Sequence, residues 1–237
     1  MAENRDGCRT ISANLLDVRA RLARAAERVS RDPSAIRLLA VSKTHPIDAV
    51  RAACLAGQRE FGENRVQEAL QKISLSSDTA IQWHLVGHLQ SNKARKAAAV
   101  FACIHSIDSV DLLERVDAGA LEAGHRPDVL VQVDLAGEPT KHGATLETLL
   151  PLFEAAATCR AVRVAGLMVL PPFAANPEET RPYFARLREI RDELGGRGVP
   201  SSMLQELSMG MSHDFEIAIE EGATLVRVGS AIFGNRG

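Results

Sequence analysis

Short apolar runs alternate with segments of helical periodicity along almost the whole chain, and this alternation limits the possible folds more than any other feature. Runs such as 38–43, 81–86 and 162–170 consist largely of apolar residues, and a turn and an amphipathic stretch follow each of them. Parallel strands covered on both faces have such sequences, because crossover helices pack on each side of the sheet. We count eight strand-then-helix units after one extra helix, predicted over about 9–30.

Eight such units in 237 residues fit a (β/α)8 TIM barrel, an α/β fold that typically needs about 250 residues. The alternative is an open doubly wound sheet, which usually carries a glycine-rich phosphate loop after its first strand. Here that position holds Lys43-Thr44-His45-Pro46, so the barrel is favoured. We expect residues 1–237 to form one domain, because no long linker or low-complexity tract divides them.

Composition excludes several classes of partner. A net charge of -2 and an aromatic content of 4% argue against nucleic acid, and no apolar run is long enough to span a membrane. The four cysteines lie far apart without a CxxC pair, which is typical of reduced, buried thiols. The N-terminus lacks the apolar segment of a signal peptide. We therefore expect a cytoplasmic protein.

The stretch 204–234 predicts two strands that each end in a small-residue turn, at 208–212 and at 229–230, with a helix over 214–221 between them. Free backbone amides and hydroxyls in such turns can hold a phosphate group. The alternative is a pair of ordinary strand-to-helix turns, with Ser212 as a helix N-cap. Arg227, inside an otherwise apolar strand, favours the anion site.

Closure of a barrel brings the last strand beside the first, so Lys43 should lie next to Arg227 and the Gly229-Ser230 turn. A lysine at the end of an apolar strand can extend to solvent or pair with Glu60 or Glu63. It can also attack an aldehyde, because burial and a neighbouring cation favour the neutral amine. With a phosphate site one strand away, we favour a Schiff-base lysine.

Five segments stand out along the chain: AVSKTHP at 40–46, FGENRVQEAL at 61–70, WHLVGHLQSNK at 83–93, GLMVLPP at 166–172 and LSMGMSHDFEIAIEEGATLVRVGSAIFG at 207–234. These segments resemble the YggS/PROSC family of pyridoxal-phosphate (PLP) homeostasis proteins. That family is similar to the N-terminal barrel domain of alanine racemase and has PLP fold type III.

The resemblance implies a set of cofactor contacts. It makes Lys43 the Schiff-base lysine for PLP, and it puts Arg227 at the pyridine nitrogen and Asn64 near the 3-hydroxyl group. The implied phosphate contacts are Ser208, Gly210, Gly229 and Ser230, with the backbone of Met209 close by. The chain departs from the family pattern at His88, where proline is usual, at Ser230, where threonine is usual, and at His45.

These residues favour PLP binding in vitamin B6 homeostasis and amino-acid balance, without robust turnover. An arginine at the ring nitrogen keeps that atom unprotonated and weakens the electron sink that catalysis needs. In alanine racemase a tyrosine from a second domain supplies the opposite base. We expect no such domain here, and the one tyrosine, Tyr183, falls on a predicted outer helix. The alternatives are a weak amino-acid racemase using Lys43 and His84, and an aldolase-type barrel with a Schiff-base lysine.

Further expectations concern partners and metals. Apo PLP-enzymes are candidate recipients of the cofactor, Lys141 is a candidate second docking amine during its transfer, and a monomer is expected. His84 and His88 are four residues apart, but they fall on a strand and in the following turn. We therefore expect no metal site from them.

Overall fold

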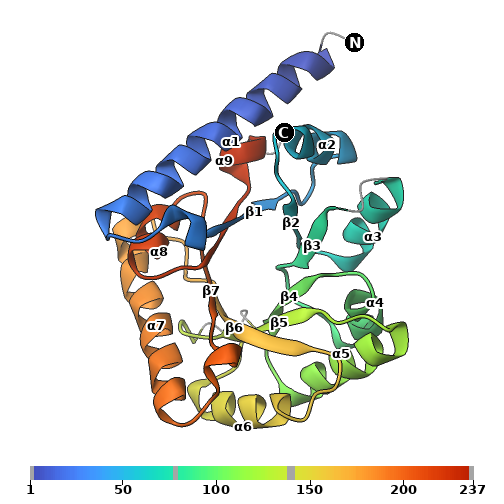
Figure 1. Cartoon of the computed structure of the whole chain (residues 1–237), viewed down its shortest axis with the longest axis vertical. Helices are drawn as coiled ribbons and strands as arrows, with labels where there is room; N and C mark the ends of the chain where they lie inside the picture. The colour runs from blue at the N-terminus through green and yellow to red at the C-terminus, as the bar shows by residue number, and fades with distance from the viewer. Residues whose placement is uncertain (1–2, 77–79, 138–141, 235–237) are drawn as a thin grey trace.

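The computed structural model describes residues 3–76, 80–137 and 142–234, and it contains a closed barrel of eight parallel strands. Each strand pairs with the next along the chain, and β8 pairs with β1, so the predicted (β/α)8 architecture is confirmed (Figure 1). The strands are β1 (Arg37–Val41), β2 (Glu60–Glu63), β3 (Gln82–Leu85), β4 (Cys103–Ile107), β5 (Asp128–Val133), β6 (Arg163–Val169), β7 (Glu206–Met211) and β8 (Leu225–Val228).

Helices surround the barrel and cover its outer face (Figure 1). They are α1 (Glu3–Arg28), α2 (Ile47–Leu55), α3 (Val66–Leu75), α4 (Ala94–Ala98), α5 (Val110–Ala123), α6 (Leu146–Ala156), α7 (Arg181–Gly196), α8 (Phe215–Glu220) and α9 (Ser230–Phe233). Short 3-10 turns occur at Pro33–Ala35, Ser91–Lys93, Pro177–Thr180 and Ser201–Met203. None of the helices in the described ranges is both long and apolar enough to cross a membrane.

The extra N-terminal helix is present as α1, although it begins earlier and ends earlier than the predicted 9–30. It packs across α2, α8 and α9, so the first helix is in contact with the last two helices of the chain (Figure 1). Leu15 and Val18 are fully buried in this contact layer, and Asn14 Nδ2 donates a hydrogen bond of 2.9 Å to the carbonyl of Ile232 in α9.

Side chains on each strand alternate between the helix layer and the barrel interior. The interior holds two small apolar groups, Leu39, Val41, Val86 and Leu225 in one and Cys103, Leu130, Ala165 and Met168 in the other. The much larger apolar cluster lies between the strands and the helices, and Trp83 belongs to it.

The end of β7 differs from the sequence prediction. Ser208, Met209 and Gly210 were expected in a turn, but they lie within the strand. The reason is a register shift: β7 pairs with β8 at Ser208↔Leu225 and at Met211↔Arg227, which leaves an extra residue on β7. Gly210 accommodates this irregularity with φ +87°, and a Cβ there would lie only 2.5 Å from Cβ of Ala218.

The closing pair of strands sets the geometry at the carboxyl end of the barrel. Leu39 of β1 lies opposite Arg227 of β8, and Ala40 lies opposite Val228. Lys43 stands in the turn directly after β1, while Gly229 and Ser230 follow β8. The predicted adjacency of the first and eighth strands is therefore confirmed, and with it the meeting of their two loops.

Candidate functional site

A cavity of about 600 Å³ opens at the carboxyl ends of the strands. Five of the predicted cofactor residues line it: Lys43, Asn64, Arg227, Gly229 and Ser230. Ser208, Met209 and Gly210 do not line it, because β7 continues past them before it reaches the cavity wall. The remaining lining residues are Val41, His45, Val86, Gly87, His88, Leu170, Phe173, Met211, Ser212, His213 and Gly234.

The residue before Lys43 is held by a buried ion pair. Nζ of Lys72 lies 2.6 Å from Oε1 of Glu63 and donates a hydrogen bond of 2.7 Å to the carbonyl of Ser42. The hydroxyl of Ser42 in turn donates to the same Glu63 oxygen at 2.7 Å. Glu63 and Ser42 are fully buried, so this network fixes the end of β1 to the end of β2 from below.

The residue after Lys43 is held by the same cation. Nζ of Lys72 lies 2.8 Å from Oε1 of Glu68, and that oxygen accepts the amide hydrogen of Thr44 at 2.5 Å. Thr44 has φ +66°, a left-handed conformation that is unusual for a β-branched residue. Lys72 thus anchors the backbone on both sides of Lys43 and supports a strained turn.

The electrostatics of this network centre on Glu63. Burial raises the pKa of its carboxyl group, while the hydrogen bonds from Lys72 and Ser42 oppose that shift. The second oxygen of Glu63, Oε2, is buried and has no hydrogen-bond partner among the described residues. Glu60, the other carboxylate considered as a partner for Lys43, is 3.0 Å from Nε of Arg37. Glu63 and Glu60 therefore form ion pairs with Lys72 and Arg37, respectively.

Asn64 directly follows Glu63 and is fixed by close backbone packing. A Cβ on Gly87 would lie 2.3 Å from the carbonyl oxygen of Asn64, so only glycine fits at that point of the loop after β3. The hydroxyl of Ser106 donates to the Gly87 carbonyl at 2.8 Å and ties this loop to β4.

Arg227 forms the cationic floor of the cavity and is only 4% exposed. Its Nη1 donates to the Ser208 hydroxyl oxygen at 2.6 Å, and its Nη2 donates to the carbonyl of Val169 at 2.8 Å. Burial lowers the pKa of Arg227 to about 10, with Asp214 opposing the shift. The guanidinium therefore stays charged at neutral pH and has one orientation.

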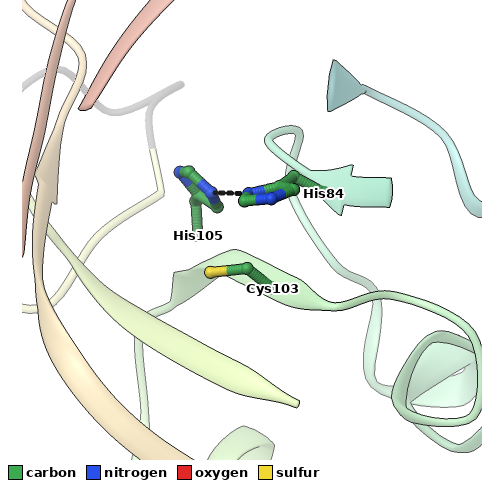
Figure 2. Close-up of side chains that lie close together, drawn as sticks. All are labelled: His84, Cys103 and His105. Carbon is green, nitrogen blue, oxygen red and sulfur yellow. Dashed lines mark hydrogen bonds between the residues drawn. The ribbon is translucent and has the colours of Figure 1, made fainter. Parts of the chain in front are cut away.

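A chain of hydrogen bonds continues from Ser208 into the barrel. Its hydroxyl lies 2.9 Å from Nδ1 of His105, and Nε2 of His105 lies 3.0 Å from Nδ1 of His84, as the dashed line in Figure 2 shows. Arginine can only donate, so the Ser208 hydrogen is left for His105. With Ser208 as the donor, His105 carries its proton on Nε2 and donates a hydrogen bond to Nδ1 of His84, which then has its own proton on Nε2.

Burial keeps His84 and His105, the two histidines of this hydrogen-bond series, neutral. Burial lowers the pKa of His84 to about 3, and it holds the pKa of His105 well below its usual value, with smaller contributions from His84 and Arg227. Nε2 of His84 is buried and has no partner among the described residues, so the chain of donors ends there. The sulfur of Cys103 lies close to both rings (Figure 2), but burial raises the pKa of this thiol. A neutral thiol and two bonded imidazoles make poor metal ligands.

The turn after β8 presents converging amides. The amide groups of Gly229 and Ala231 both donate to the hydroxyl oxygen of Ser212, at 3.1 and 3.3 Å. Ser212 therefore bonds across to the turn after β8, and α8 has no side-chain hydrogen bond at its N-cap, Asp214. The two donors meet at one oxygen atom, an arrangement that a phosphate oxygen can also satisfy.

Sequence reasoning missed the residues that support the site from below. Lys72 and Glu68 were detectable as a favourable i,i+4 pair on α3, but the buried partner Glu63 could not be inferred from spacing. His105 lies on an apolar strand and gave no motif. The predicted second docking amine, Lys141, lies outside the described residues.

Replacing Lys72 with methionine should destabilise the protein by about 3–5 kcal/mol, because it leaves the buried Glu63 carboxylate without its cation. Urea denaturation of the purified variant measures this loss. Lys96→Met, on the exposed face of α4, is the matched control and should change stability by about 0.5 kcal/mol or less. The double variant Lys72→Met, Glu63→Met should recover most of the loss. Equal stability of the two single variants would contradict the role of this network.

Acidification should destabilise the fold through the two interior histidines. The unfolded chain takes up protons near a histidine pKa of about 6.5, whereas folded His84 and His105 stay neutral, so stability is lost as pH falls. Each histidine removes up to about 1.4 kcal/mol per pH unit below that value. Urea titrations at several pH values between neutral and mildly acidic measure the slope. His84→Leu should make it shallower, and an unchanged slope would contradict the assignment.

Comparison with known proteins relates this chain to a family. The sequence profile described as alanine racemase, N-terminal domain, matches residues 14–237. The pyridoxal phosphate homeostasis protein of Aquifex aeolicus is 44% identical over 216 residues, which cover 91% of this chain and 94% of that protein. The protein of the same name from Escherichia coli is 40% identical over 229 residues, covering 95% of this chain and 97% of the relative.

Solved structures agree with this relation. PipY of Synechococcus elongatus, solved with PLP bound, is 42% identical and has a TM-score of 0.84, covering 94% of this chain and 100% of PipY. Alanine racemase of Clostridium difficile, at 14% identity, shares the fold, with a TM-score of 0.70 over 96% of this chain and 57% of the racemase. The chain therefore belongs to the alanine racemase N-terminal domain family, and within it to the pyridoxal phosphate homeostasis proteins.

Proposed function

We propose that this protein binds PLP in the cavity between β1 and β8 and acts in the cellular balance of vitamin B6, without robust catalytic turnover. One observation carries the proposal: Lys43, Arg227 and the amide-bearing turn after β8 all meet at one cavity. Its volume of about 600 Å³ lies in the range of small-molecule sites. The names of the relatives and the PLP bound to PipY support this assignment.

The donor set suits the cofactor's charged groups. The hydroxyls of Ser212 and Ser230 would donate to the phosphate group, and the amides of Gly229 and Ala231 would bind it in place of the Ser212 oxygen that they bond in the structure. Asn64 would lie near the ring hydroxyl, and Arg227 would face the pyridine nitrogen, as the family resemblance implies. Bound PLP supplies an aldehyde and a conjugated ring that can accept electrons.

The proposal differs from the sequence expectation for Ser208, Met209 and Gly210, which do not line the cavity and are not assigned direct contacts with the phosphate. The Ser208 hydroxyl is engaged by Arg227 and His105, and Met209 packs in the outer helix layer. We assign to Ser208 the task of orienting Arg227. The phosphate contacts on this side of the cavity are assigned to Met211, the last residue of β7, and to Ser212 in the turn that follows.

Lys43 is proposed as the amine that holds the cofactor covalently. Its amine would be the group that condenses with the aldehyde of bound PLP, a reaction that releases one water molecule. The anchors on both sides of Lys43 fix its backbone at the cavity wall, so the approach of Nζ needs little ordering.

Borohydride reduction of the protein after incubation with PLP should place a pyridoxyl group on the peptide that contains Lys43. Mass spectrometry of the digest identifies the modified lysine, and the absorbance of the bound cofactor should bleach on reduction. Lys43→Ala should lose the adduct, whereas Lys96→Ala, on exposed α4, should retain it. An adduct on another lysine in the wild-type protein would refute the assignment. A protein that carries reducible PLP would also exclude the aldolase alternative.

Weak catalysis follows from Arg227. Its guanidinium is a permanent donor that two hydrogen bonds hold in place, so it cannot protonate a ring nitrogen in the way a carboxylic acid does. The racemase alternative named His84 as a second base. His84 is buried below the cavity, bonded to His105, and does not line the wall. The structure thus gives no support to that pairing.

Assays of racemisation, decarboxylation and transamination with PLP-loaded protein should give rates far below about 1 s⁻¹, the lower end of ordinary enzyme turnover. Chiral chromatography of amino acids after long incubation measures the first reaction, and product analysis measures the others. Lys43→Ala serves as the background. Turnover at ordinary enzyme rates with any common amino acid would refute a carrier function.

The wider setting remains part of the proposal. We suggest that the protein acts as a monomer in the cytoplasm and passes PLP to apo-enzymes that depend on it. The separated cysteines suit such a compartment, and in the described part of the chain Cys103 and Cys159 are free thiols.

A further inference from the structure

Three potential metal ligands meet at the rim of the cavity, on the loops that follow three consecutive strands. His88 follows β3, Asp108 follows β4, and His142 belongs to the loop after β5. Their ligand atoms all lie within 4.8 Å of one another, and Nδ1 of His88 is 3.9 Å from Oδ2 of Asp108. We refer to His88, Asp108 and His142 as the rim cluster.

The backbone of each rim residue is fixed by a neighbouring strand. The carbonyl of Gly87, just before His88, accepts a hydrogen bond from Ser106 of β4. The carbonyl of His142 accepts one of 2.5 Å from Nε2 of Gln132 on β5. Asp108 directly follows the last residue of β4. The three side chains are therefore brought together by the barrel itself, from three consecutive loops.

Contacts within the rim cluster do not account for this convergence. The rings of His88 and His142 are stacked with centroids 3.5 Å apart and an interplanar angle of 13°. Face-to-face stacking with centroids this close is less favourable than offset or edge-to-face packing, and 3.9 Å is too long for a hydrogen bond. In the described part of the chain, these three side chains form no hydrogen bond with one another. A positive ion between them would supply the missing attraction.

We propose that the rim cluster binds a divalent transition-metal ion, with Zn²⁺ as the preferred ion, through two imidazoles and one carboxylate. This set of three protein ligands leaves coordination positions open, as in metal sites that also bind a substrate or water. His88 also lines the cavity, so the ion would lie at its rim, where a carboxylate-bearing small molecule can complete its coordination.

Binding requires a small rearrangement. An ion lies near the plane of each imidazole that coordinates it, so the two stacked rings cannot share an ion until one of them turns. His142 is exposed and the side chain of His88 is 36% exposed, so rotation of either ring disturbs no packed core. Side chains of this kind rotate within nanoseconds.

Titration calorimetry of the PLP-free protein with zinc chloride tests the proposal, with Co²⁺ absorption as a second readout of imidazole coordination. We expect one ion per chain. His88→Gln, Asp108→Asn and His142→Gln should each weaken binding about tenfold or more, since even indirect support of a metal site is worth about that much. All three positions are on loops at the surface, and circular dichroism checks that the variants fold.

Two control variants separate this site from other metal ligands. His213→Gln removes another histidine of the cavity wall, and Cys103→Ala removes the thiol of the interior group, and neither should alter zinc affinity. The proposal fails if no ion binds, if the rim variants bind as tightly as the wild type, or if a control lowers affinity as much as they do. The result is independent of the proposed function, because borohydride labelling of Lys43 reports PLP binding separately.

Discussion

A buried ammonium group, Nζ of Lys72, organises the side of the barrel that carries Lys43. It neutralises Glu63 at the end of β2, holds the carbonyl of Ser42 and positions Glu68 against the amide of Thr44. The desolvation cost of such an ion pair is high, and apolar side chains of similar volume stabilise many cores as well or better. Apolar side chains, however, cannot form the directional hydrogen bonds that fix a turn. Three oxygen atoms around one cation fix the turn that carries Lys43 at the edge of the cavity.

The opposite wall of the cavity contains a second buried cation, Arg227. The two buried positive charges have different kinds of hydrogen-bond partner. Lys72 is paired with carboxylates, whereas the described partners of Arg227 are neutral oxygens of Ser208 and Val169, with Asp214 as a weaker electrostatic influence. The charge of Arg227 is therefore not cancelled locally, and it can act on a polar group in the cavity. Closure of β8 onto β1 brings this charge and Lys43 into one site. The composition of the site therefore depends on the closure of the barrel.

Much of this arrangement was predictable from sequence, because it depends on periodicity and on topology. The eight strand-then-helix units, the extra N-terminal helix and the neighbourhood of Lys43 and Arg227 all follow from alternation and closure. The location of Ser208 within β7 was not predictable, since the strand continues only because of a register shift against β8. Contacts such as Lys72 with Glu63 and His105 with His84 join side chains from different elements, and no spacing rule encodes them.

The two groups of histidines show how burial decides what the same residue types can do. His84 and His105 lie inside the barrel beside a neutral thiol. Nδ1 of His84 is bonded to Nε2 of His105, and Nδ1 of His105 is bonded to the Ser208 hydroxyl. A metal ion there would have to displace those bonds and deprotonate Cys103, whose pKa burial raises. The charge of Arg227, which lowers the pKa of His105, also opposes any further positive charge. At the rim, His88 and His142 are in contact with solvent and face the carboxylate of Asp108 without hydrogen bonds to it. There an ion loses little hydration and gains three ligands, so coordination is favoured at the rim and opposed in the interior.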